Sequence, residues 1–383
     1  MTRWFPAMAQ LMMMAAVCDT GGEGDVLELR QVRVDDPHEM EVRVKLLTTS
    51  ICRSDIHYLR NVWVHPKPAI FGHEACGVIE SVGPGVPKSR IGEKVILTFT
   101  PSCGQCKFCV TGRSVLCEEV ARAAMAGTMW DNSTRFFETS GRPIHHLSLV
   151  SSFCEYTVVP HNGAITIDPA TSDEQACLLG CGAMAGIGAA LNTAQLRPGE
   201  SVAVFGCGGV GLSVVQGAKL CNALPIVAVD LRAEKEAEAL RFGATHFVNA
   251  SQSDPVARIR EITGVGADFT FEATGQVEIA ELAYKATCRA GTTVLIGQPT
   301  ENAMAGFPPY WIAQDENKVI GSSYGSTRPM IDFPKVLRFV KHGLLNLESL
   351  ISEVWPLSRI NEAIRLVESG TVNRIVLRLA ERA

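Results

Sequence analysis

A glycine-rich turn between an apolar strand and a helix constrains the fold of this chain more than any other feature of its sequence. The segment SVAVFGCGGVGLSVVQGAKL starts with a β-branched apolar run and continues with a helical apolar pattern, and Gly206, Gly208 and Gly211 stand between them with G-x-G-x-x-G spacing. Such a turn lets the backbone approach a pyrophosphate closely at the N-terminus of the helix. The spacing therefore predicts a βαβ unit that binds a dinucleotide.

The alternation of strands and helices continues beyond the turn. The apolar strands PIVAVD, HFVNA, ADFTFEA and TTVLIG alternate with the helical segments AEKEAEALRFG, DPVARIREITG and VEIAELAYKATC. This order is typical of a parallel sheet that is covered by helices on both faces. Residues 183–325 are therefore predicted to form a doubly wound α/β domain of the Rossmann type.

The chain on either side of this unit has a different pattern of apolar residues and turn signals. Residues 1–182 contain EVRVKLLTTS, GVIESV and EKVILTFT between turn signals, which predicts a β-rich body. Residues 326–383 contain the amphipathic segments FPKVLRFVKHGLL and INEAIRLVESG and a closing strand, NRIVLRLA. Because 383 residues exceed what one core usually organises, we expect the α/β unit to be inserted into a first domain formed by residues 1–182 and 326–383.

Composition excludes several classes of partner. The chain is 46% hydrophobic with a net charge of −5, and no basic run suggests binding to nucleic acid or to an anionic membrane. No apolar run reaches the roughly 20 residues of a membrane span. Thirteen cysteines, several of them in motifs that need thiolates, favour a reducing, cytoplasmic compartment over a secreted disulfide framework.

The first residues, MTRWFPAMAQLMMMAAV, could pass for a weak signal-peptide core, but they lack a convincing cleavage site. We expect residues 1–13 to be either a short extension or a start-site artefact. The segments AAVCD and DVLELRQVRV that follow are predicted to form paired opening strands.

A carboxylate after the second strand of the α/β unit indicates which dinucleotide is bound. Asp230 ends the strand PIVAVD, where a carboxylate can bind both ribose hydroxyls, while Gly209 and Val210 complete the glycine turn. The charge of Asp230 would repel a 2′-phosphate, and the nearby Arg232 offsets this only in part. NAD(H) is therefore predicted as the cofactor in preference to NADP.

Four cysteines lie close together in the segment of about residues 101–120, which we call the lobe. Cys103, Cys106, Cys109 and Cys117 have the spacing C-x2-C-x2-C-x7-C, and four thiolates can close a tetrahedron around Zn²⁺. The resulting charge of −2 leaves little Lewis acidity, so this site is predicted to be structural. An iron–sulfur cluster is the competing interpretation, but the x3-C-P continuation of bacterial ferredoxins is absent.

A second set of candidate ligands is scattered along the chain. Cys52 stands in ICRSD, His73 in FGHEACG and Cys181 in LLGCG. Two thiolates and one imidazole neutralise Zn²⁺ and leave a fourth position open, and such a zinc lowers the pKa of a bound water or alcohol. Single residues of these types are more often packing residues than ligands, so this prediction depends on the other motifs.

The motifs together resemble the zinc-dependent alcohol dehydrogenases of the medium-chain dehydrogenase/reductase superfamily, in particular the longer animal- and plant-type members (class I or class III). The segments ICRSD, GHEACGVIESVG, FTPSCGQCKFC, STRF, GRPIHH, SSFCEYTVV, LLGCG, VFGCGGVGLSVVQGAKL and NRIVL follow one another in the family's order. The resemblance implies a GroES-like catalytic domain interrupted by a Rossmann domain, two zinc ions per chain, and interconversion of an alcohol and an aldehyde or ketone by hydride transfer to or from NAD(H). It also implies a homodimer.

The same resemblance assigns roles to individual residues. Cys52, His73 and Cys181 would bind the catalytic zinc, with Glu74 as an alternate oxygen ligand and Asp55 orienting His73. Ser54 and His57 would relay the proton, because CRSDIH matches the family's relay at both positions. Arg53 and Arg374 would meet the cofactor pyrophosphate. Lys235 would contact the ribose, with a solvated residue of the helical segment AEKEAEAL as the alternative. The substrate pocket would be lined by Ser54, Phe99 and Leu147, with Trp130, Phe136 and the region of Tyr324 at its mouth.

Two departures from the family pattern keep alternatives open. Relatives that oxidise the formaldehyde–glutathione adduct carry an arginine soon after the last lobe cysteine, and Arg122 is displaced by one position from that place; S-(hydroxymethyl)glutathione dehydrogenase is therefore the alternative activity. Ala185 replaces a threonine that many members place near the nicotinamide. A non-catalytic nucleotide-binding protein and a double-bond reductase are both disfavoured by the intact zinc ligands.

Overall fold

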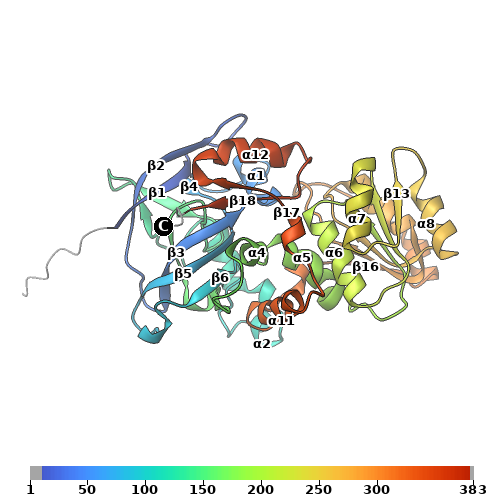
Figure 1. Ribbon diagram of the computed structural model, residues 1–383, viewed down its shortest axis with the longest axis horizontal. Helices are drawn as coiled ribbons and strands as arrows, with labels where there is room; N and C mark the ends of the chain where they lie inside the picture. The colour runs from blue at the N-terminus through green and yellow to red at the C-terminus, as the bar shows by residue number, and fades with distance from the viewer. Residues whose placement is uncertain (1–10, 380–383) are drawn as a thin grey trace, which may run out of the picture.

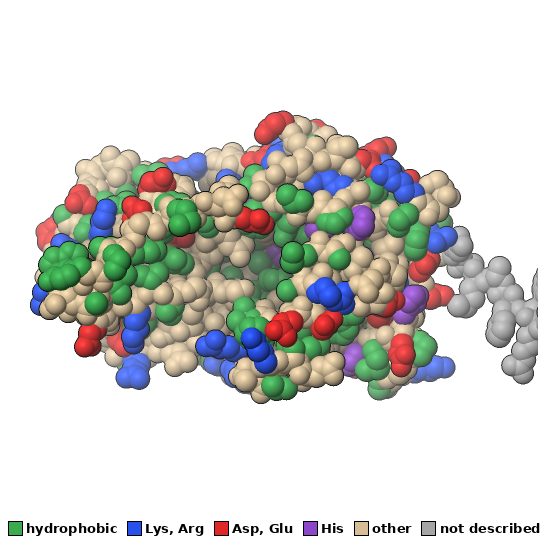
Figure 2. Space-filling model, turned by 180° about the vertical axis from the view of Figure 1, so that it is seen from behind, with side chains coloured by type: hydrophobic (Ala, Val, Ile, Leu, Met, Phe, Trp, Pro, Cys, Tyr) green, Lys and Arg blue, Asp and Glu red, His purple; other side chains and the backbone are tan. Residues whose placement is uncertain are grey.

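The computed structural model describes residues 11–379, which form two halves side by side (Figure 1). One half is rich in β-strands and contains both the blue N-terminal strands and the red C-terminal segments. The other half, coloured green to orange, is an α/β unit. Seen from behind, the surface is hollowed between the two halves, and hydrophobic side chains are visible inside the hollow (Figure 2).

The α/β half contains a parallel sheet of six strands within the described residues, in the order β13-β12-β11-β14-β15-β16. This is the 3-2-1-4-5-6 order of doubly wound dinucleotide-binding domains, which confirms the predicted fold class. The strands are β11 (Val202–Phe205), β12 (Ile226–Asp230), β13 (His246–Asn249), β14 (Ala267–Glu272), β15 (Thr287–Leu295) and β16 (Lys318–Gly321). The helices are α6 (Gly209–Leu220), α7 (Glu236–Phe242), α8 (Pro255–Thr263), α9 (Val277–Lys285) and α10 (Pro309–Gln314), with the short 3-10 turn η5 (Ala233–Lys235) before α7. Strand β16, which sequence analysis did not predict, forms one edge of the sheet.

The β-rich half is built from a closed barrel and a second sheet. The barrel runs β1-β2-β7-β8-β4, and the sheet runs β10-β6-β5-β3-β18-β17 with β9 also paired to β3. The strands are β1 (Leu11–Cys18), β2 (Leu27–Val34), β3 (Glu41–Ser50), β4 (Ala69–Ile70), β5 (Glu74–Val82), β6 (Lys94–Leu97), β7 (Phe136–Phe137), β8 (Pro143–His146), β9 (Tyr156–Pro160), β10 (Ala164–Thr166), β17 (Ile351–Pro356) and β18 (Arg374–Arg378). The helices are α1 (Arg53–Leu59), α2 (Lys107–Val110), α3 (Glu118–Ala126), α4 (Asp173–Leu178), α5 (Gly182–Gly188), α11 (Pro329–Lys341) and α12 (Ile360–Glu368).

The chain returns to the β-rich half after the α/β unit. Strand β18 pairs antiparallel with β3, with Val376 opposite Ser50, and parallel with β17. This arrangement is compatible with the insertion expected from the sequence, and the boundaries at residues 182/183 and 325/326 stay predictions.

The opening strands are present, but they begin earlier than the sequence suggested. Strand β1 pairs with β2 from Leu11 opposite Val34 onwards, and the Met13 side chain is fully buried. Leu11, Met12 and Met13 therefore belong to the barrel rather than to an extension, because alternate side chains of β1 face its core. The remaining ten residues of the expected extension lie outside the described part of the chain.

Helix α5 joins the two halves and is buried at every position. It packs against α6, the helix that follows the glycine turn. Cys181 is the N-cap residue of α5, so this packing brings one candidate zinc ligand close to the candidate dinucleotide site. Among residues 11–379, no helix is both long enough and apolar enough to cross a membrane.

Candidate active site and metal centres

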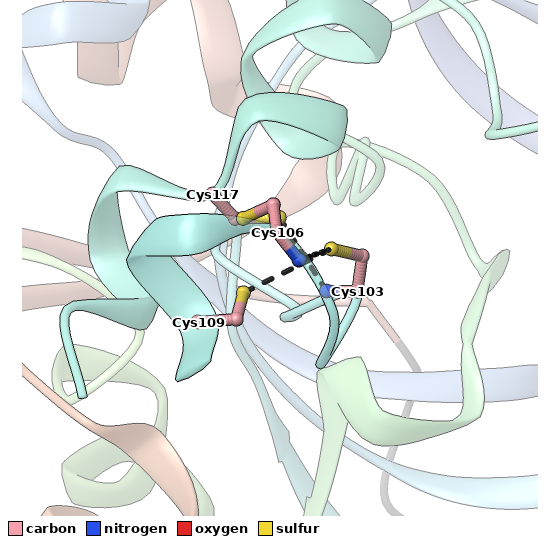
Figure 3. Close-up of side chains that lie close together, drawn as sticks. All are labelled: Cys103, Cys106, Cys109 and Cys117. Atoms are coloured by element: carbon pink, nitrogen blue, oxygen red, sulfur yellow. Dashed lines mark hydrogen bonds between the residues drawn. The ribbon is translucent and has the colours of Figure 1, made fainter. Parts of the chain in front are cut away.

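The structure brings the four lobe cysteines together in one cluster (Figure 3). The four sulfur atoms of Cys103, Cys106, Cys109 and Cys117 all lie within 4.8 Å of one another. Backbone N–H groups of Cys103 and Cys106 point at the sulfurs of Cys117 and Cys103, each at 3.4 Å. The backbone N–H groups of Glu118 and Cys109 lower the pKa of Cys106 to about 6. A closed set of four sulfurs with amide donors around it fits a tetrahedral Zn²⁺ with no open position.

The scattered ligand candidates form a second cluster, at the junction of the two halves. Cys52 is the N-cap residue of α1, Cys181 is that of α5, and His73 directly precedes Glu74, the first residue of β5. One donor atom from each of these residues lies within 4.8 Å of all the others. Two sulfurs, an imidazole nitrogen and a carboxylate oxygen are donors that zinc accepts, so the residues fit the metal.

The two thiols of this cluster are electrostatically different. The sulfurs of Cys52 and Cys181 are 3.9 Å apart. Hydrogen bonding from the Cys181 thiol lowers the pKa of Cys52 well below its usual value, and the same contact raises the pKa of Cys181. The contact between the two sulfurs therefore favours a thiolate within this pair, and the thiolate is the form in which cysteine binds metals.

Asp55 fixes the orientation of His73. Its Oδ1 atom lies 2.8 Å from Nδ1 of His73 and accepts a hydrogen bond from the Gly72 backbone at 3.2 Å, while Oδ2 accepts one from the Cys52 backbone at 3.0 Å. Burial opposes a charge on His73, but Asp55 overcomes it and raises the pKa of the imidazole. Nε2 of His73 is then directed toward the cluster, 3.2 Å from the Ser54 hydroxyl.

Glu74 and Arg374 meet behind the ligand cluster. Oε1 of Glu74 accepts a hydrogen bond from the Gly182 backbone at 2.9 Å, whereas Oε2 is buried without a hydrogen-bond partner. Burial raises the pKa of Glu74 to about 7. Nη2 of Arg374 lies 3.9 Å from Oε1, and a Cβ atom on Gly182 would come within 1.7 Å of that nitrogen. Only glycine fits at position 182, directly after Cys181.

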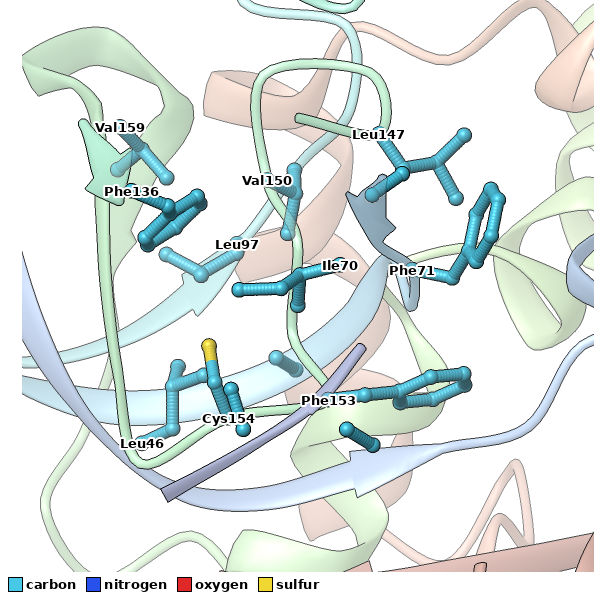
Figure 4. Packing of buried hydrophobic residues seen from close by; sticks show 14 of the residues in the cluster. Leu46, Ile70, Phe71, Leu97, Phe136, Leu147, Val150, Phe153, Cys154 and Val159 are labelled. Atoms are coloured by element: carbon cyan, nitrogen blue, oxygen red, sulfur yellow. The ribbon is translucent and has the colours of Figure 1, made fainter. Parts of the chain in front are cut away.

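A cavity of about 300 Å³ opens in front of the cluster. Its walls include Ser54, His57, Phe99, Leu147 and Tyr324, together with Arg53, Tyr58, Trp63, Ala185, Val210, Thr274 and Gln298. Leu147 belongs to the packed core of the β-rich half, near Phe71 (Figure 4), so this wall is rigidly supported.

Two pocket predictions are wrong. Phe136 is fully buried in the barrel against the ring of His146, and Trp130 packs against the same core; neither lines the cavity. Both lie on a long segment whose aromatic residues could not be assigned to pocket or core from sequence. Trp63, which was not predicted from sequence, also lines the cavity, and its ring packs against His57 at a ring-centroid distance of 4.7 Å with the two planes tilted by 41°.

The glycine turn and Asp230 lie together at the C-terminal edge of the parallel sheet. Oδ2 of Asp230 accepts a hydrogen bond from the Cys207 backbone at 2.7 Å, and Oδ1 accepts one from the Arg232 backbone at 3.0 Å. A Cβ atom on Gly208 would meet nothing within 4 Å, so this glycine borders open space that a ligand can occupy. The guanidinium of Arg374 lies close to Gly209, and its buried Nη2 has no hydrogen-bond partner. These features fit a dinucleotide.

The remaining candidates around this site are engaged with neighbouring residues. Arg53 donates to the Glu368 carbonyl at 3.2 Å. Lys235 is buried, and its Nζ donates to Asn373 and Glu238. Arg122 lies on the outer face of α3, where it binds Glu119 and the Trp130 carbonyl, and it does not line the cavity.

Comparison with known families agrees with this architecture. The family described as "Alcohol dehydrogenase GroES-like domain" matches residues 38–169, and the family described as "Zinc-binding dehydrogenase" matches residues 209–342. "Alcohol dehydrogenase-like 6" of Arabidopsis thaliana is 37% identical over 370 residues, covering 95% of each chain. "S-(hydroxymethyl)glutathione dehydrogenase" of Saccharomyces cerevisiae is 37% identical over 364 residues, covering 93% of this chain and 94% of the yeast protein.

Two solved structures share the whole fold. An alcohol dehydrogenase zinc-binding domain protein from Burkholderia ambifaria superposes with a TM-score of 0.93 at 32% identity, and benzyl alcohol dehydrogenase from Acinetobacter calcoaceticus with 0.91 at 29%. Both comparisons cover 97% of this chain and all of the other. The chain belongs to the zinc-dependent alcohol dehydrogenases of the medium-chain dehydrogenase/reductase superfamily, and it is an oxidoreductase of that family.

Proposed function

We propose that this protein is an NAD(H)-dependent zinc alcohol dehydrogenase that interconverts small primary alcohols, including aromatic ones, and their aldehydes. The observation that carries the proposal is that one cavity is lined both by Cys52, His73 and Cys181 and by Val210 of the glycine turn. A substrate in this cavity touches the metal ligands on one side and the dinucleotide site on the other.

Cys52, His73 and Cys181 hold the catalytic zinc, and the four lobe cysteines hold the structural one. Zinc bound at the first of these sites would act as a Lewis acid that makes an alcohol hydroxyl more acidic, and NAD⁺ bound at the glycine turn would accept the hydride. Glu74, whose Oε2 has no partner, is the reserve oxygen ligand.

Ser54 and His57 carry the proton away from the substrate oxygen. They are three residues apart on α1 and both line the cavity, as expected for neighbours on one helix face. Burial, and then the charge of Arg53, lower the pKa of His57, so its imidazole is neutral at pH 7 and can accept a proton. Its half-exposed ring passes that proton to solvent.

The cavity walls support a small, largely apolar substrate. Phe99 and Tyr324 face each other with a ring-centroid distance of 4.5 Å, and Leu147 and Trp63 add apolar surface. These rings suit an aromatic alcohol. The likeness to benzyl alcohol dehydrogenase of A. calcoaceticus is in line with this choice.

The glutathione-dependent activity is the second candidate, because the yeast relative of that name is 37% identical to this chain. The position of Arg122 counts against it. Its guanidinium is bound to Glu119 and the Trp130 carbonyl outside the cavity, so it offers no cation for a substrate carboxylate there.

A homodimer and a cytoplasmic location complete the proposal. Among residues 11–379, strand β16 has no partner along its outer edge, and Tyr310 and Trp311 on α10 are 69% and 50% exposed. An open edge strand beside exposed aromatic residues suits pairing with a second copy about a two-fold axis. The cysteine-rich zinc sites support a reducing compartment.

The proposal is tested by steady-state kinetics of the zinc-loaded enzyme, followed by NADH absorbance, with ethanol, hexanol, benzyl alcohol and S-(hydroxymethyl)glutathione. We expect the highest kcat/KM with benzyl alcohol and NAD⁺. A preference for S-(hydroxymethyl)glutathione would replace the substrate assignment, and absence of turnover with every alcohol and aldehyde would overturn the activity. Light scattering after gel filtration measures the mass of the assembly.

A further inference from the structure

Two segments from different halves are bound together beside the glycine turn. One is the stretch from Asp230 to Glu238 in the α/β half, and the other is residues 368–374, between α12 and β18 in the β-rich half. Arg232 donates from Nη1 to the Gly370 carbonyl at 2.7 Å and from Nη2 to the Ser369 carbonyl at 2.9 Å. The guanidinium of Arg232 therefore forms its hydrogen bonds to the backbone of the β-rich half.

Asn373 is the centre of this contact. Its Oδ1 accepts a hydrogen bond from Nζ of Lys235 at 2.8 Å, and its Nδ2 donates to Oε1 of Glu238 at 2.5 Å. Glu238 in turn accepts from Lys235 at 3.2 Å, so the three side chains close a ring. The Asn373 backbone is anchored by a 3.0 Å hydrogen bond to Ser352, and both Asn373 and Lys235 are more than 90% buried.

The ring lies next to the residues that fit a dinucleotide. Lys235 is the last residue of η5 and follows Asp230 by five positions, and Arg374 directly follows Asn373. The charges of Asp230, Lys235 and Glu238 all act on the buried Cys207 thiol inside the glycine turn. The ring is therefore a neighbour of the turn rather than a remote surface contact.

A lysine ammonium has three N–H donors, and two of them are used within the ring. The third remains for a ligand. Without Asn373, Lys235 would keep only Glu238, a partner on its own half, and its flexible four-carbon chain would no longer be held from the other side.

We propose that Asn373 is a positioning residue for the cofactor: it holds the ammonium of Lys235 in place for the adenosine ribose and makes both halves contribute to that subsite. The inference rests on the proposed function, because it takes NAD(H) as the ligand. The same contacts keep Arg232 bound to two carbonyls, so its guanidinium cannot turn to a 2′-phosphate without giving them up.

The first test is the equilibrium binding of NADH and of ADP-ribose to the zinc-loaded Asn373→Leu variant, measured by NADH fluorescence and by calorimetry. We expect both dissociation constants to rise about tenfold, the effect of one lost hydrogen bond to a charged group. The kcat at saturating NAD⁺ should change less than about twofold, since the nicotinamide end is untouched. Arg241→Gln is the matched control, because it removes a solvent-exposed partner of the same Glu238 at 3.6 Å and should leave binding unchanged.

A swap of the two side chains separates positioning from general stability. Asn373→Asp alone places two carboxylates against each other and should weaken NADH binding as much as Asn373→Leu does. Combining it with Glu238→Gln restores one amide and one carboxylate with the original net charge. We expect the double variant to bind NADH within about threefold of the unmodified protein.

Unchanged dissociation constants in Asn373→Leu, or no recovery in the double variant, would overturn the inference. An equal loss of zinc, thermal stability and kcat would overturn it too, because it would make the role of Asn373 structural. If the unmodified protein binds NADPH more tightly than NADH, the proposed NAD(H) dependence is wrong. This measurement needs no variant, so it tests the proposed function separately from the role of Asn373.

Discussion

The imidazole of His73 donates through Nδ1 to Oδ1 of Asp55 over 2.8 Å, inside a pocket where Asp55 is fully buried. The same carboxylate accepts the backbone N–H of Cys52 at 3.0 Å. One side chain therefore positions two of the candidate zinc ligands at once, although it is not itself a ligand. Hydrogen bonds of this kind set both the orientation and the basicity of a metal-bound histidine.

We expect Asp55→Asn to weaken binding of the catalytic zinc by about 10–100-fold, because a neutral amide replaces the carboxylate that polarises His73. Zinc occupancy during titration with a chelator measures this directly. The lobe zinc serves as an internal control and should be retained. Unaltered chelator resistance at both sites would show that Asp55 has no influence on the metal.

Cys52→Ser should remove one of two zinc ions per chain and abolish turnover, since serine is a poor zinc ligand at neutral pH. NADH binding should persist, because the glycine turn does not depend on this residue. Metal analysis and NADH fluorescence are the two measurements. Cys221→Ser is the control, as Cys221 is a partly buried cysteine outside both clusters. Turnover that survives in Cys52→Ser would contradict the zinc mechanism.

Cys106→Ser should also remove one zinc per chain, but with a different consequence. The lobe has no open coordination position, so its loss should lower the melting temperature by about 5 °C or more before it lowers kcat. Calorimetry and kinetics on the same preparation distinguish the two effects. A loss of kcat at unchanged melting temperature would assign the lobe a direct part in catalysis.

Stability should fall on the acid side because of a buried histidine. His65 donates from Nε2 to the His146 carbonyl at 2.9 Å and packs between Tyr58 and Phe71. Burial lowers the pKa of His65 to about 4, below the value near 6.5 of the unfolded chain. The unfolded state therefore binds the proton first, so stability is present above pH 6.5 and is lost as the pH falls from about 6.5 to 4, by about 3 kcal/mol in total.

The His65→Gln variant should flatten this dependence. Urea unfolding at pH 7.5, 6 and 5 gives the free energies, and the slope between pH 6 and 5 should decrease relative to the unmodified protein. The exposed His342, replaced by Gln, provides the comparison for a histidine on the surface. If the free energy of unfolding depends on pH in the same way in the His65→Gln variant and in the unmodified protein, His65 does not cause the loss of stability in acid.

The unmodified enzyme should favour NAD⁺ over NADP⁺ by about 100-fold or more in kcat/KM, because the Asp230 carboxylate repels a 2′-phosphate. Asp230→Ser should narrow this ratio chiefly by raising KM for NAD⁺. Because Arg232 is held by Ser369 and Gly370, we do not expect the substitution alone to make NADP⁺ the better cofactor. A preference for NADP⁺ in the unmodified enzyme would contradict the role of Asp230.

The parts of the molecule that local patterns specify could be predicted from sequence. The glycine turn, strands β11 to β15 and helices α6 to α9 each carry their own periodicity and breaking residues, so the doubly wound sheet follows from them. Strand β16 was missed because its four residues, Lys318–Gly321, include only two strongly apolar ones between a lysine and a glycine. The resemblance to a family supplied the scattered ligand set, which the structure brings to one place.

The features that could not be predicted from sequence are those that depend on packing between residues far apart in the chain. Phe136 and Phe99 are both aromatic residues near strand signals, yet one fills the barrel and the other faces the cavity. The contact between Lys235 and Asn373 joins residues 138 positions apart, and no local signal marks an asparagine just before a closing strand as its partner. The sequence placed Lys235 beside the cofactor without revealing what holds it.

The position of β18 has a consequence for biosynthesis. This strand lies between β3 and β17, and its first residue, Arg374, contacts Glu74 behind the ligand cluster. A chain emerging from the ribosome presents Cys52, His73 and Cys181 long before residue 374, so the nascent protein holds thiols and an imidazole beside a sheet that still lacks an inner strand. The active centre therefore cannot be completed before residue 374 has been synthesised, whereas the α/β half, complete in sequence by β16, can fold ahead of the half whose two segments flank it in the sequence.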